Sequence, residues 1–197
     1  MVRTQHDAAR SIGDKPMKSI VPSSFKKAHV IGLFVLAVGF LATPMLMPSV
    51  GNAQDARVAK SMAALKDQTT KLGAPKIDGK DAVGGRDAPA LYFGSTKMNN
   101  NFSVVDAVAE QGGRGMVVTL FVKSRDDYIR VATNVSTRVG GRGIGTILAG
   151  SALESIKAGN AYYGRVPVLG TPYISGYEPI KDASGAIIGV YFVGYKK

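Results

Sequence analysis

Residues 116–135 are Met116-Val-Val-Thr-Leu-Phe-Val122, Lys123-Ser-Arg-Asp-Asp127 and Tyr128-Ile-Arg-Val-Ala-Thr-Asn-Val135. The outer two runs are rich in β-branched and aromatic residues and their link is short and polar, which predicts two adjacent antiparallel strands. Side chains alternate across a strand, so one face is expected to carry Tyr128, Arg130, Ala132 and Asn134, and the other Ile129, Val131, Thr133 and Val135. Arg130 then lies either exposed at the sheet edge or inside a pocket beneath covering loops.

A long helix is predicted ahead of these strands, over residues 54–72. Its apolar positions recur at spacings of three and four, which places them on one helical face: Val58, Met62, Leu65, Thr69 and Leu72. Gly73 and Pro75 end the pattern. We expect this face to pack against the sheet. The alternative is a seam between two copies of the chain, which would make a homodimer.

Two shorter helices are predicted from their first residues. Ser103 is expected to be the N-cap of one, with Asp106 three residues later, and Ser151 with Glu154 is expected to form the capping box of the other. The second of these helices ends at Gly159, because glycine is a common helix terminator.

Three further strands are predicted at residues 161–169, 173–180 and 186–195. The links between them are short and contain turn-forming residues, so neighbouring strands are expected to be antiparallel. Residues 91–93 add a short strand, whereas the glycines and prolines of residues 73–90 predict a loop. The expected fold is α+β, with a central antiparallel sheet of about five strands and a long N-terminal helix on one face.

The first 53 residues are predicted to be a leader. They hold six basic residues against two acidic ones, and Val30–Ala42 is an uncharged run that is shorter than the roughly 20 residues of a membrane span. Gly51-Asn-Ala53 offers small residues for signal-peptide cleavage after Ala53, which predicts export to the periplasm. The alternative is an uncleaved anchor in the inner membrane that faces the periplasm, and translation starts at either Met1 or Met17.

The composition excludes several classes of function. The chain has no cysteine, and both histidines (His6 and His29) fall in the leader, so zinc sites and cysteine or histidine catalysis are not expected after export. No cofactor or metal site is predicted. The net charge of +11 favours anionic partners, but the basic residues are spread singly, which argues against nucleic acid.

A series of short motifs resembles the Cache domain family of bacterial extracytoplasmic sensors, in particular the Cache 3/Cache 2 fusion type. The motifs are Thr119-Leu120-Phe121, Tyr128–Val135, Gly145-Thr146, Gly159-Asn-Ala-Tyr-Tyr-Gly164, Leu169-Gly-Thr-Pro-Tyr173, Gly176–Asp182 and Gly185–Gly194. The resemblance extends from about Leu91 to Tyr195. It implies a PAS-like sheet with the N-terminal helix on one face and a ligand pocket on the other. It also implies a function in signal transduction or chemotaxis.

The resemblance, together with the expected strand faces, suggests a binding site for a small carboxylate or amino acid. Arg130 would clamp the anion, and Phe121 and Tyr128 lie beside it in the matching segment. Hydroxyl groups for hydrogen bonds would come from Tyr163, Tyr173 and Tyr177. Occupancy would be passed to a partner, either a membrane receptor or a sensor kinase.

The sequence thus divides into a leader (1–53), a helix and loop (54–90) and a Cache-like core (91–197). Two other classes of function stay open. One is a structural or interaction protein that kept the fold without a working pocket. The other is a periplasmic enzyme that works without His or Cys, for which no spacing of Ser, Thr, Lys, Tyr or carboxylates suggests a catalytic set.

Overall fold

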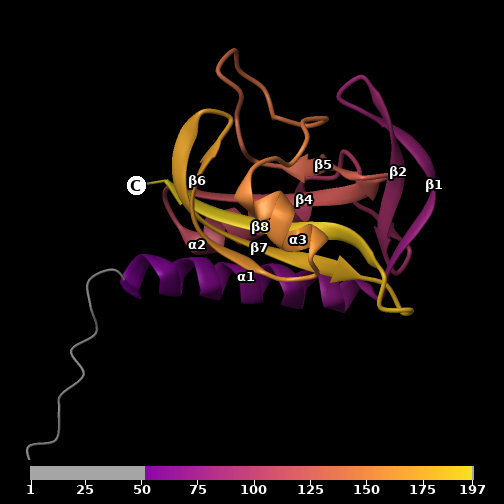
Figure 1. Cartoon of the computed structure of the whole chain (residues 1–197), viewed down its shortest axis with the longest axis horizontal. Coiled ribbons are helices and arrows are strands. Elements are labelled where there is room, and N and C mark those ends of the chain that lie inside the picture. Colours follow the sequence, from indigo (N-terminus) through magenta and orange to yellow (C-terminus); the bar gives the residue numbers. More distant parts are fainter. Residues whose placement is uncertain (1–51, 197) are drawn as a thin grey trace, which may run out of the picture. The chain divides into compact units, whose positions relative to one another are not determined.

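The computed structural model describes residues 52–196 (Figure 1), so the predicted signal peptide and its anchor alternative lie outside the described residues. The elements in chain order are α1 (Asn52–Leu72), β1 (Pro75–Val83), β2 (Arg86–Phe93), β3 (Thr96–Lys97), α2 (Ser103–Gly112), β4 (Met116–Ser124), β5 (Asp127–Thr133), α3 (Ser151–Lys157), β6 (Tyr162–Val168), β7 (Thr171–Lys181) and β8 (Ile187–Lys196).

Five strands form the main sheet, in the order β5-β4-β8-β7-β6, and every neighbouring pair is antiparallel. The short links β4–β5, β6–β7 and β7–β8 make the adjacent pairs, as expected for hairpins. The predicted α+β fold with a central sheet of about five strands is confirmed.

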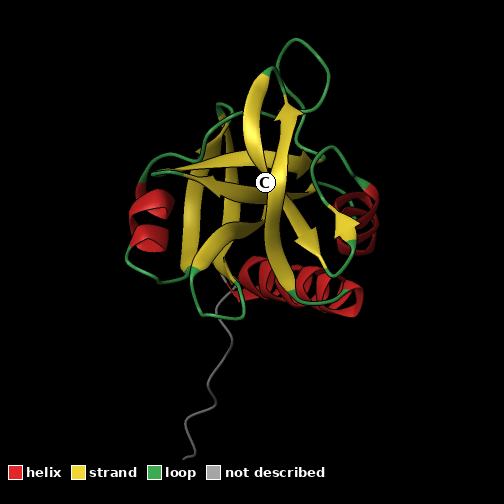
Figure 2. Ribbon diagram, turned by 90° about the vertical axis from the view of Figure 1, so that its right-hand side faces the viewer, coloured by secondary structure: helices red, strands yellow, loops and turns green. Residues whose placement is uncertain are grey.

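Helices cover both faces of this sheet (Figure 2). The predicted face of α1 is confirmed, because Val58, Met62 and Leu65 are buried against the sheet together with the apolar side of α2. On the opposite face, α3 and the loop before it cover a second apolar cluster that contains Phe121, Tyr177 and Phe192. Among the described residues, no helix is long and apolar enough to cross a membrane.

The prediction of a loop over residues 73–90 is wrong. β1 and β2 form an antiparallel hairpin whose turn is Gly84-Gly85. Both glycines have positive φ angles, +56° and +76°, which is the backbone of a two-residue hairpin turn. Because most side chains of β1 are exposed, this strand lacks the apolar alternation that would have revealed it.

The predicted helix caps are also corrected. Ser103 is the first residue of α2 rather than its N-cap, and its hydroxyl donates to Asn101 Oδ1 at 2.8 Å. Asp106 binds Arg142 instead, with Nη1–Oδ1 and Nη2–Oδ2 distances of 2.6 and 2.8 Å. The N-cap of α3 is Gly150, which has no side chain to bond the helix, so the predicted capping box does not form.

A β-bulge in β5 changes which residues share a face. Leu120 pairs with Ala132 and the next residue, Phe121, pairs with Arg130, so Val131 is an extra residue in the strand. Ala132 therefore packs with Val131 in the cluster beneath α1, and not on the face of Arg130 as the regular alternation predicts. After the bulge the alternation is reversed, and Val135 lies in the cluster on the α3 side of the sheet.

Candidate functional site

Arg130 is the buried charged residue at the centre of the site. It lies on β5 and is only 4% exposed. The backbone of Arg130 is hydrogen-bonded to residues 145 and 146 of the loop that follows β5. Arg130 N donates to Thr146 O at 2.9 Å, and Gly145 N donates to Arg130 O at 2.8 Å. The same loop also binds the guanidinium, because Arg130 Nη1 donates to Thr146 Oγ1 at 2.7 Å. Thr146 Oγ1 in turn donates to Gly143 O at 2.8 Å.

The Phe121 ring and the backbone at Gly143 lie close to the Arg130 guanidinium. The Arg130 Cζ atom lies 5.0 Å from the centre of the Phe121 ring. A Cβ atom on Gly143 would lie 3.3 Å from Arg130 Nη1 and 2.7 Å from Leu169 Cδ1. A side chain at position 143 would therefore push Leu169 or Arg130 aside, and the segment of residues 134–150 (hereafter the covering segment) passes close to the arginine.

The guanidinium carries its charge without an acidic partner. Burial lowers the pKa of Arg130 from its ordinary value to about 10, and Tyr177 and Tyr173 oppose this shift. The group is therefore still protonated at neutral pH. Arg130 belongs to none of the ion pairs formed by the described residues. A buried charge without a counter-charge is strongly disfavoured unless another group compensates it.

Two buried polar atoms on this face have no hydrogen-bond partner within the described part of the chain. They are Nε of Arg130 and Oγ of Ser175, whose side chain is 1% exposed. Ser175 lies between Tyr173 and Tyr177 on β7, and these two tyrosines face the α3 side of the sheet. Buried polar groups are rarely left unpaired in folded proteins, so Nε of Arg130 indicates a place where a polar ligand is accommodated.

Tyr173 and Tyr177 complete the surroundings of Arg130, and we call Phe121, Arg130, Thr146, Tyr173 and Tyr177 the arginine site. Burial raises the pKa of both tyrosines above its usual value, and Arg130 opposes the shift in each case. Both hydroxyls therefore stay protonated at neutral pH and can donate hydrogen bonds. The Tyr177 ring packs against Phe192 with a centroid distance of 4.7 Å, which fixes its position.

Residues 43–197 match the family model of the Cache 3/Cache 2 fusion domain. The chain belongs to this family. Members are generally extracellular sensor and binding domains, so the resemblance found in the sequence is confirmed at the level of the family and of its PAS-like fold. No curated protein matches the chain.

In this Cache domain, the predicted site residues do not all come together. Phe121, Tyr128, Tyr173 and Tyr177 lie on the α3 side of the sheet with Arg130. Tyr163 does not, because it is the neighbour of Tyr162 in β6 and adjacent residues of a strand point to opposite faces. Its hydroxyl donates to Glu178 Oε1 at 2.5 Å, and the residue is 48% exposed.

The tyrosine of β6 that faces the arginine site is Tyr162, whose ring contacts that of Tyr177 edge-on at 6.1 Å. Tyr128 is buried on the same face as Arg130, but it borders a hollow of about 280 Å³ with Lys123 and Lys157. It therefore lies towards the outer end of the cluster.

Sequence reasoning missed one member of the arginine site, Thr146. No pattern in the sequence marks this residue, since its contact with Arg130 depends on how the covering segment returns to β5.

The arginine site of this Cache domain is closed. A hollow of about 540 Å³ lies elsewhere, between the β1–β2 hairpin and the β4–β5 turn, where it is lined by Lys80, Arg86 and Arg125 among others. Tyr173 borders a smaller one of about 140 Å³ beside Arg165. Arg130 borders neither. A ligand can reach its guanidinium only if the covering segment or the side chains beneath it move.

Proposed function

We propose that this Cache domain is an extracytoplasmic sensor that binds a small carboxylate through Arg130. The observation that carries the proposal is the buried guanidinium, which forms no ion pair with a carboxylate among the described side chains of residues 56–196. Removing the partner of a buried charge typically costs about 3–5 kcal/mol, so an anion that binds next to Arg130 gains from the same effect.

The geometry of the guanidinium suggests how the anion binds. Nη1 already donates to Thr146, while Nε has no partner. A carboxylate can take two parallel hydrogen bonds from the edge formed by Nε and Nη2, which is a common arrangement for arginine. The hydroxyls of Tyr173 and Tyr177 are then available for a second oxygen of the ligand.

The charges favour a carboxylate without an ammonium group over an amino acid. Burial lowers the pKa of Arg130 and Tyr177 and Tyr173 raise it, and no carboxylate is among the groups that shift it. An amino acid would bring its ammonium group close to this guanidinium with no acidic side chain to balance it. Hydroxy, keto and simple aliphatic acids avoid this repulsion.

The structure suggests how occupancy reaches α1. Tyr177 belongs to the arginine site, and the next residue on β7, Glu178, accepts a hydrogen bond from Lys66 of α1 at 2.7 Å. A second link joins Thr69 Oγ1 to Tyr191 Oη on β8 at 3.2 Å. A ligand that shifts Tyr177 therefore also shifts an anchor of α1, and a receptor or sensor kinase that contacts α1 can detect the change.

The test is titration calorimetry of the purified chain with small carboxylic acids. A four-heavy-atom acid has a ceiling near −6 kcal/mol at about −1.5 kcal/mol per atom, which corresponds to dissociation constants of roughly tens of micromolar. Arg130→Ala is expected to abolish measurable binding because charged hydrogen bonds contribute about 1.5–3 kcal/mol each. Arg130→Lys should restore it only in part, since the two-pronged contact is lost.

Arg165→Ala is the matched control, because Arg165 is an exposed arginine on β6 outside the arginine site. It should bind as the unmodified chain does, and circular dichroism should show all variants folded. Unchanged affinity in folded Arg130→Ala would remove the arginine from the site. If the unmodified chain binds no small acid, the structural or interaction class is favoured instead.

A further inference from the structure

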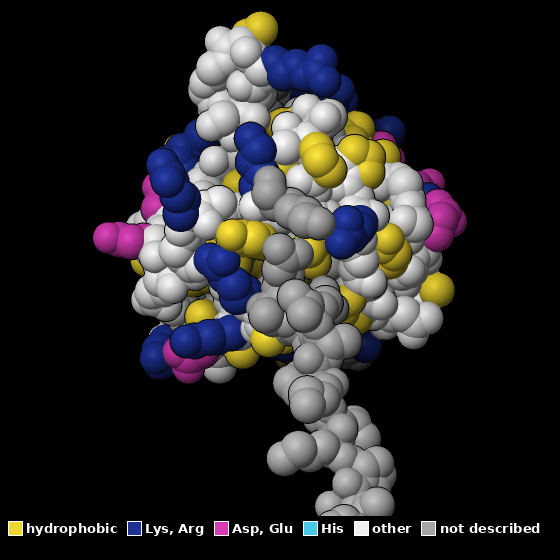
Figure 3. Space-filling model, turned by 90° about the vertical axis from the view of Figure 1, so that its left-hand side faces the viewer, with side chains coloured by type: hydrophobic (Ala, Val, Ile, Leu, Met, Phe, Trp, Pro, Cys, Tyr) yellow, Lys and Arg dark blue, Asp and Glu magenta, His cyan; other side chains and the backbone are white. Residues whose placement is uncertain are grey.

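Five basic side chains gather at the end of the domain where α1 begins and β8 finishes. We call them the basic end: Arg57, Lys60, Arg114, Arg165 and Lys196. Figure 3 looks at this end of the molecule and shows Lys and Arg side chains distributed around its face. They come from α1, the α2–β4 loop, β6 and β8, so the cluster is formed by folding and is invisible as a charge run in the sequence.

Contacts of Arg57 join α1 to the end of α2 and to β8. Its guanidinium carbon lies 4.0 Å from the centre of the Tyr195 ring on β8, and its Nη2 donates to Gly112 O at the end of α2 with a distance of 2.9 Å. Lys60 borders the same shallow hollow as Arg57 and Gly112. The second turn of α1, the end of α2 and the end of β8 therefore meet here.

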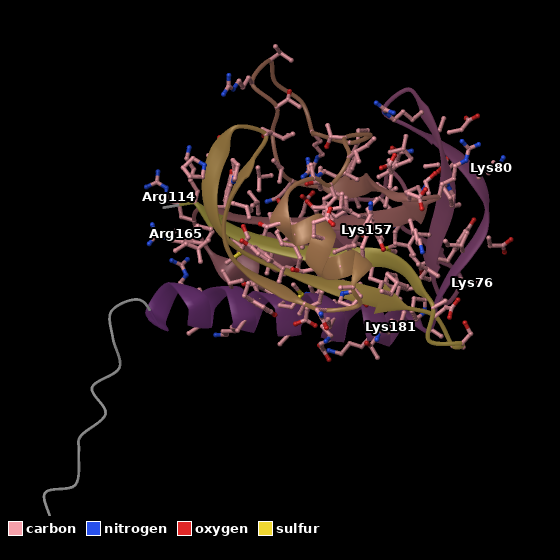
Figure 4. All side chains as sticks on the ribbon, viewed as in Figure 1. Lys76, Lys80, Arg114, Lys157, Arg165 and Lys181 are labelled. Atoms are coloured by element: carbon pink, nitrogen blue, oxygen red, sulfur yellow. The ribbon has the colours of Figure 1, made fainter. Side chains whose placement is uncertain are left out.

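The remaining members are placed by backbone pairing. Lys196 N donates to Gly115 O at 2.9 Å, which brings Lys196 beside the loop that carries Arg114. Arg165 is in register with Ile174, and Ile174 with Tyr195, so Arg165 lies two strands away from Tyr195 in the same row. Figure 4 shows Arg114 and Arg165 projecting from the same end of the molecule.

Among the side chains that the structure describes, no acid is paired with the basic end. None of its five members takes part in an ion pair among the described residues, whose pairs lie elsewhere on the surface. The acid nearest in sequence with a described side chain is Glu110, which is exposed in the last turn of α2. A concentration of like charge attracts anions, and its self-repulsion disfavours the folded state. A partner of opposite charge would therefore stabilise this end of the domain.

The position of the apolar run just before α1 indicates which partner binds the basic end. In the sequence, the apolar run Val30–Ala42 precedes Asn52, the first residue of α1, by ten positions. The chain thus enters the described domain at the basic end. In the anchored alternative, in which the leader is not cleaved, the apolar run stays in the membrane and only the nine residues 43–51 separate it from α1.

We propose that the basic end docks on the anionic phospholipid headgroups of the membrane surface. Each Lys or Arg close to an anionic surface strengthens binding by roughly fivefold at physiological salt. The proposal is independent of ligand binding at Arg130. Docking would hold α1 at a defined angle to the membrane, beside any receptor embedded in it.

The experiment uses the absence of cysteine from the chain, which allows a single fluorophore to be attached at one introduced cysteine. Gln111→Cys reports on the basic end, because Gln111 is exposed and lies beside Arg57 and Lys60. Ser184→Cys reports on the exposed β7–β8 turn. The mature chain that begins at Gln54, which lacks the basic and apolar leader, is mixed with vesicles of phosphatidylcholine, with or without phosphatidylglycerol, that carry a quencher on their headgroups.

Quenching is expected at position 111 with phosphatidylglycerol vesicles only, and salt should abolish it because screening shortens the range of the attraction. Position 184 should not be quenched. Arg114→Glu/Arg165→Glu should lower quenching at position 111 to the level of phosphatidylcholine. Lys80→Glu/Lys181→Glu makes the same change of net charge away from this end and should leave quenching intact (Figure 4).

Four outcomes would overturn the proposal. They are equal quenching in both kinds of vesicle, equal loss in both double variants, retained quenching in Arg114→Glu/Arg165→Glu, and no response to vesicles from a chain that binds double-stranded DNA through the same two arginines. The last result would assign the basic end to nucleic acid. All four substituted side chains are exposed, so circular dichroism should show both variants folded.

Discussion

At the scale of single residues, Arg130 is held in place from two sides. Thr146 accepts a hydrogen bond from Nη1, and the Phe121 ring lies beneath the guanidinium. A side chain that is already fixed loses little rotamer freedom when it binds, so less of the binding energy is spent on ordering it. This arrangement suits a small ligand, which has few atoms with which to offset such losses.

Carboxylate binding should depend on pH through the charge of Arg130. Because burial lowers the pKa of Arg130 to about 10, the guanidinium loses its proton above that pH, and affinity should fall about tenfold for each further pH unit. Binding should be flat from about pH 6 to 9, because both the ligand carboxylate and Arg130 are ionised there. Titration calorimetry between pH 6 and about 11, with circular dichroism to confirm folding, measures this. A decline that begins near neutral pH would contradict it.

The sequence predicts a residue of the arginine site only where the alternation of side chains along a strand determines the face on which that residue lies. Tyr173 and Tyr177 share a face because they are four residues apart on an unbroken strand, and Phe121 lies on the same, α3 side of the sheet. Tyr163 was misplaced because the choice between two adjacent tyrosines depends on where β6 begins. The contact of Thr146 depends on the path of a loop, which alternation does not describe.

At the scale of elements, periodic and buried segments were predicted well and polar ones poorly. The face of α1 and strands β4 to β8 follow from apolar spacing, because these elements bury one side or both. The β1–β2 hairpin escaped because β1 is mostly exposed and its glycines resemble those of a loop. The bulge at Val131 arises from pairing with β4, so the sequence of β5 by itself does not reveal it.

The packing of α1 on the sheet can be tested at Met62. This side chain is buried in the cluster between α1 and the sheet. Met62→Ala should lower the free energy of unfolding by about 2–5 kcal/mol, because it removes apolar contacts and leaves a cavity. Gln68→Ala, on the same helix and half-exposed, is the control and should change it by less than about 0.5 kcal/mol. Urea denaturation measures both, and equal effects would mean that α1 is not firmly packed.

At the scale of the whole molecule, the leader predicts that the domain works outside the cytoplasm. We expect the protein in the periplasmic fraction with its N-terminus at Gln54, because small residues precede the predicted cleavage point after Ala53. N-terminal sequencing after cell fractionation checks this. A membrane fraction that retains the leader would support the anchored alternative. Soluble cytoplasmic protein that carries the leader would contradict both.

The distribution of charge also belongs to this scale. The net charge of +11 was visible in the sequence, but the single spacing of the basic residues hid their convergence. Folding brings Arg57, Arg114 and Arg165 to one end although each is more than 50 residues from the next along the chain. Spatial clusters of this kind require the strand order and register, which composition cannot supply.

The closed cover over Arg130 has a consequence for the timing of a response. If Arg130 binds a ligand as proposed, the ligand must wait for the covering segment or the side chains beneath it to move, so its observed association rate should level off at the opening rate as its concentration rises. The same barrier slows departure, and a weakly bound small acid would then stay longer than its affinity alone implies. A sensor built in this way averages the concentration of its ligand over the lifetime of the closed state and ignores briefer fluctuations.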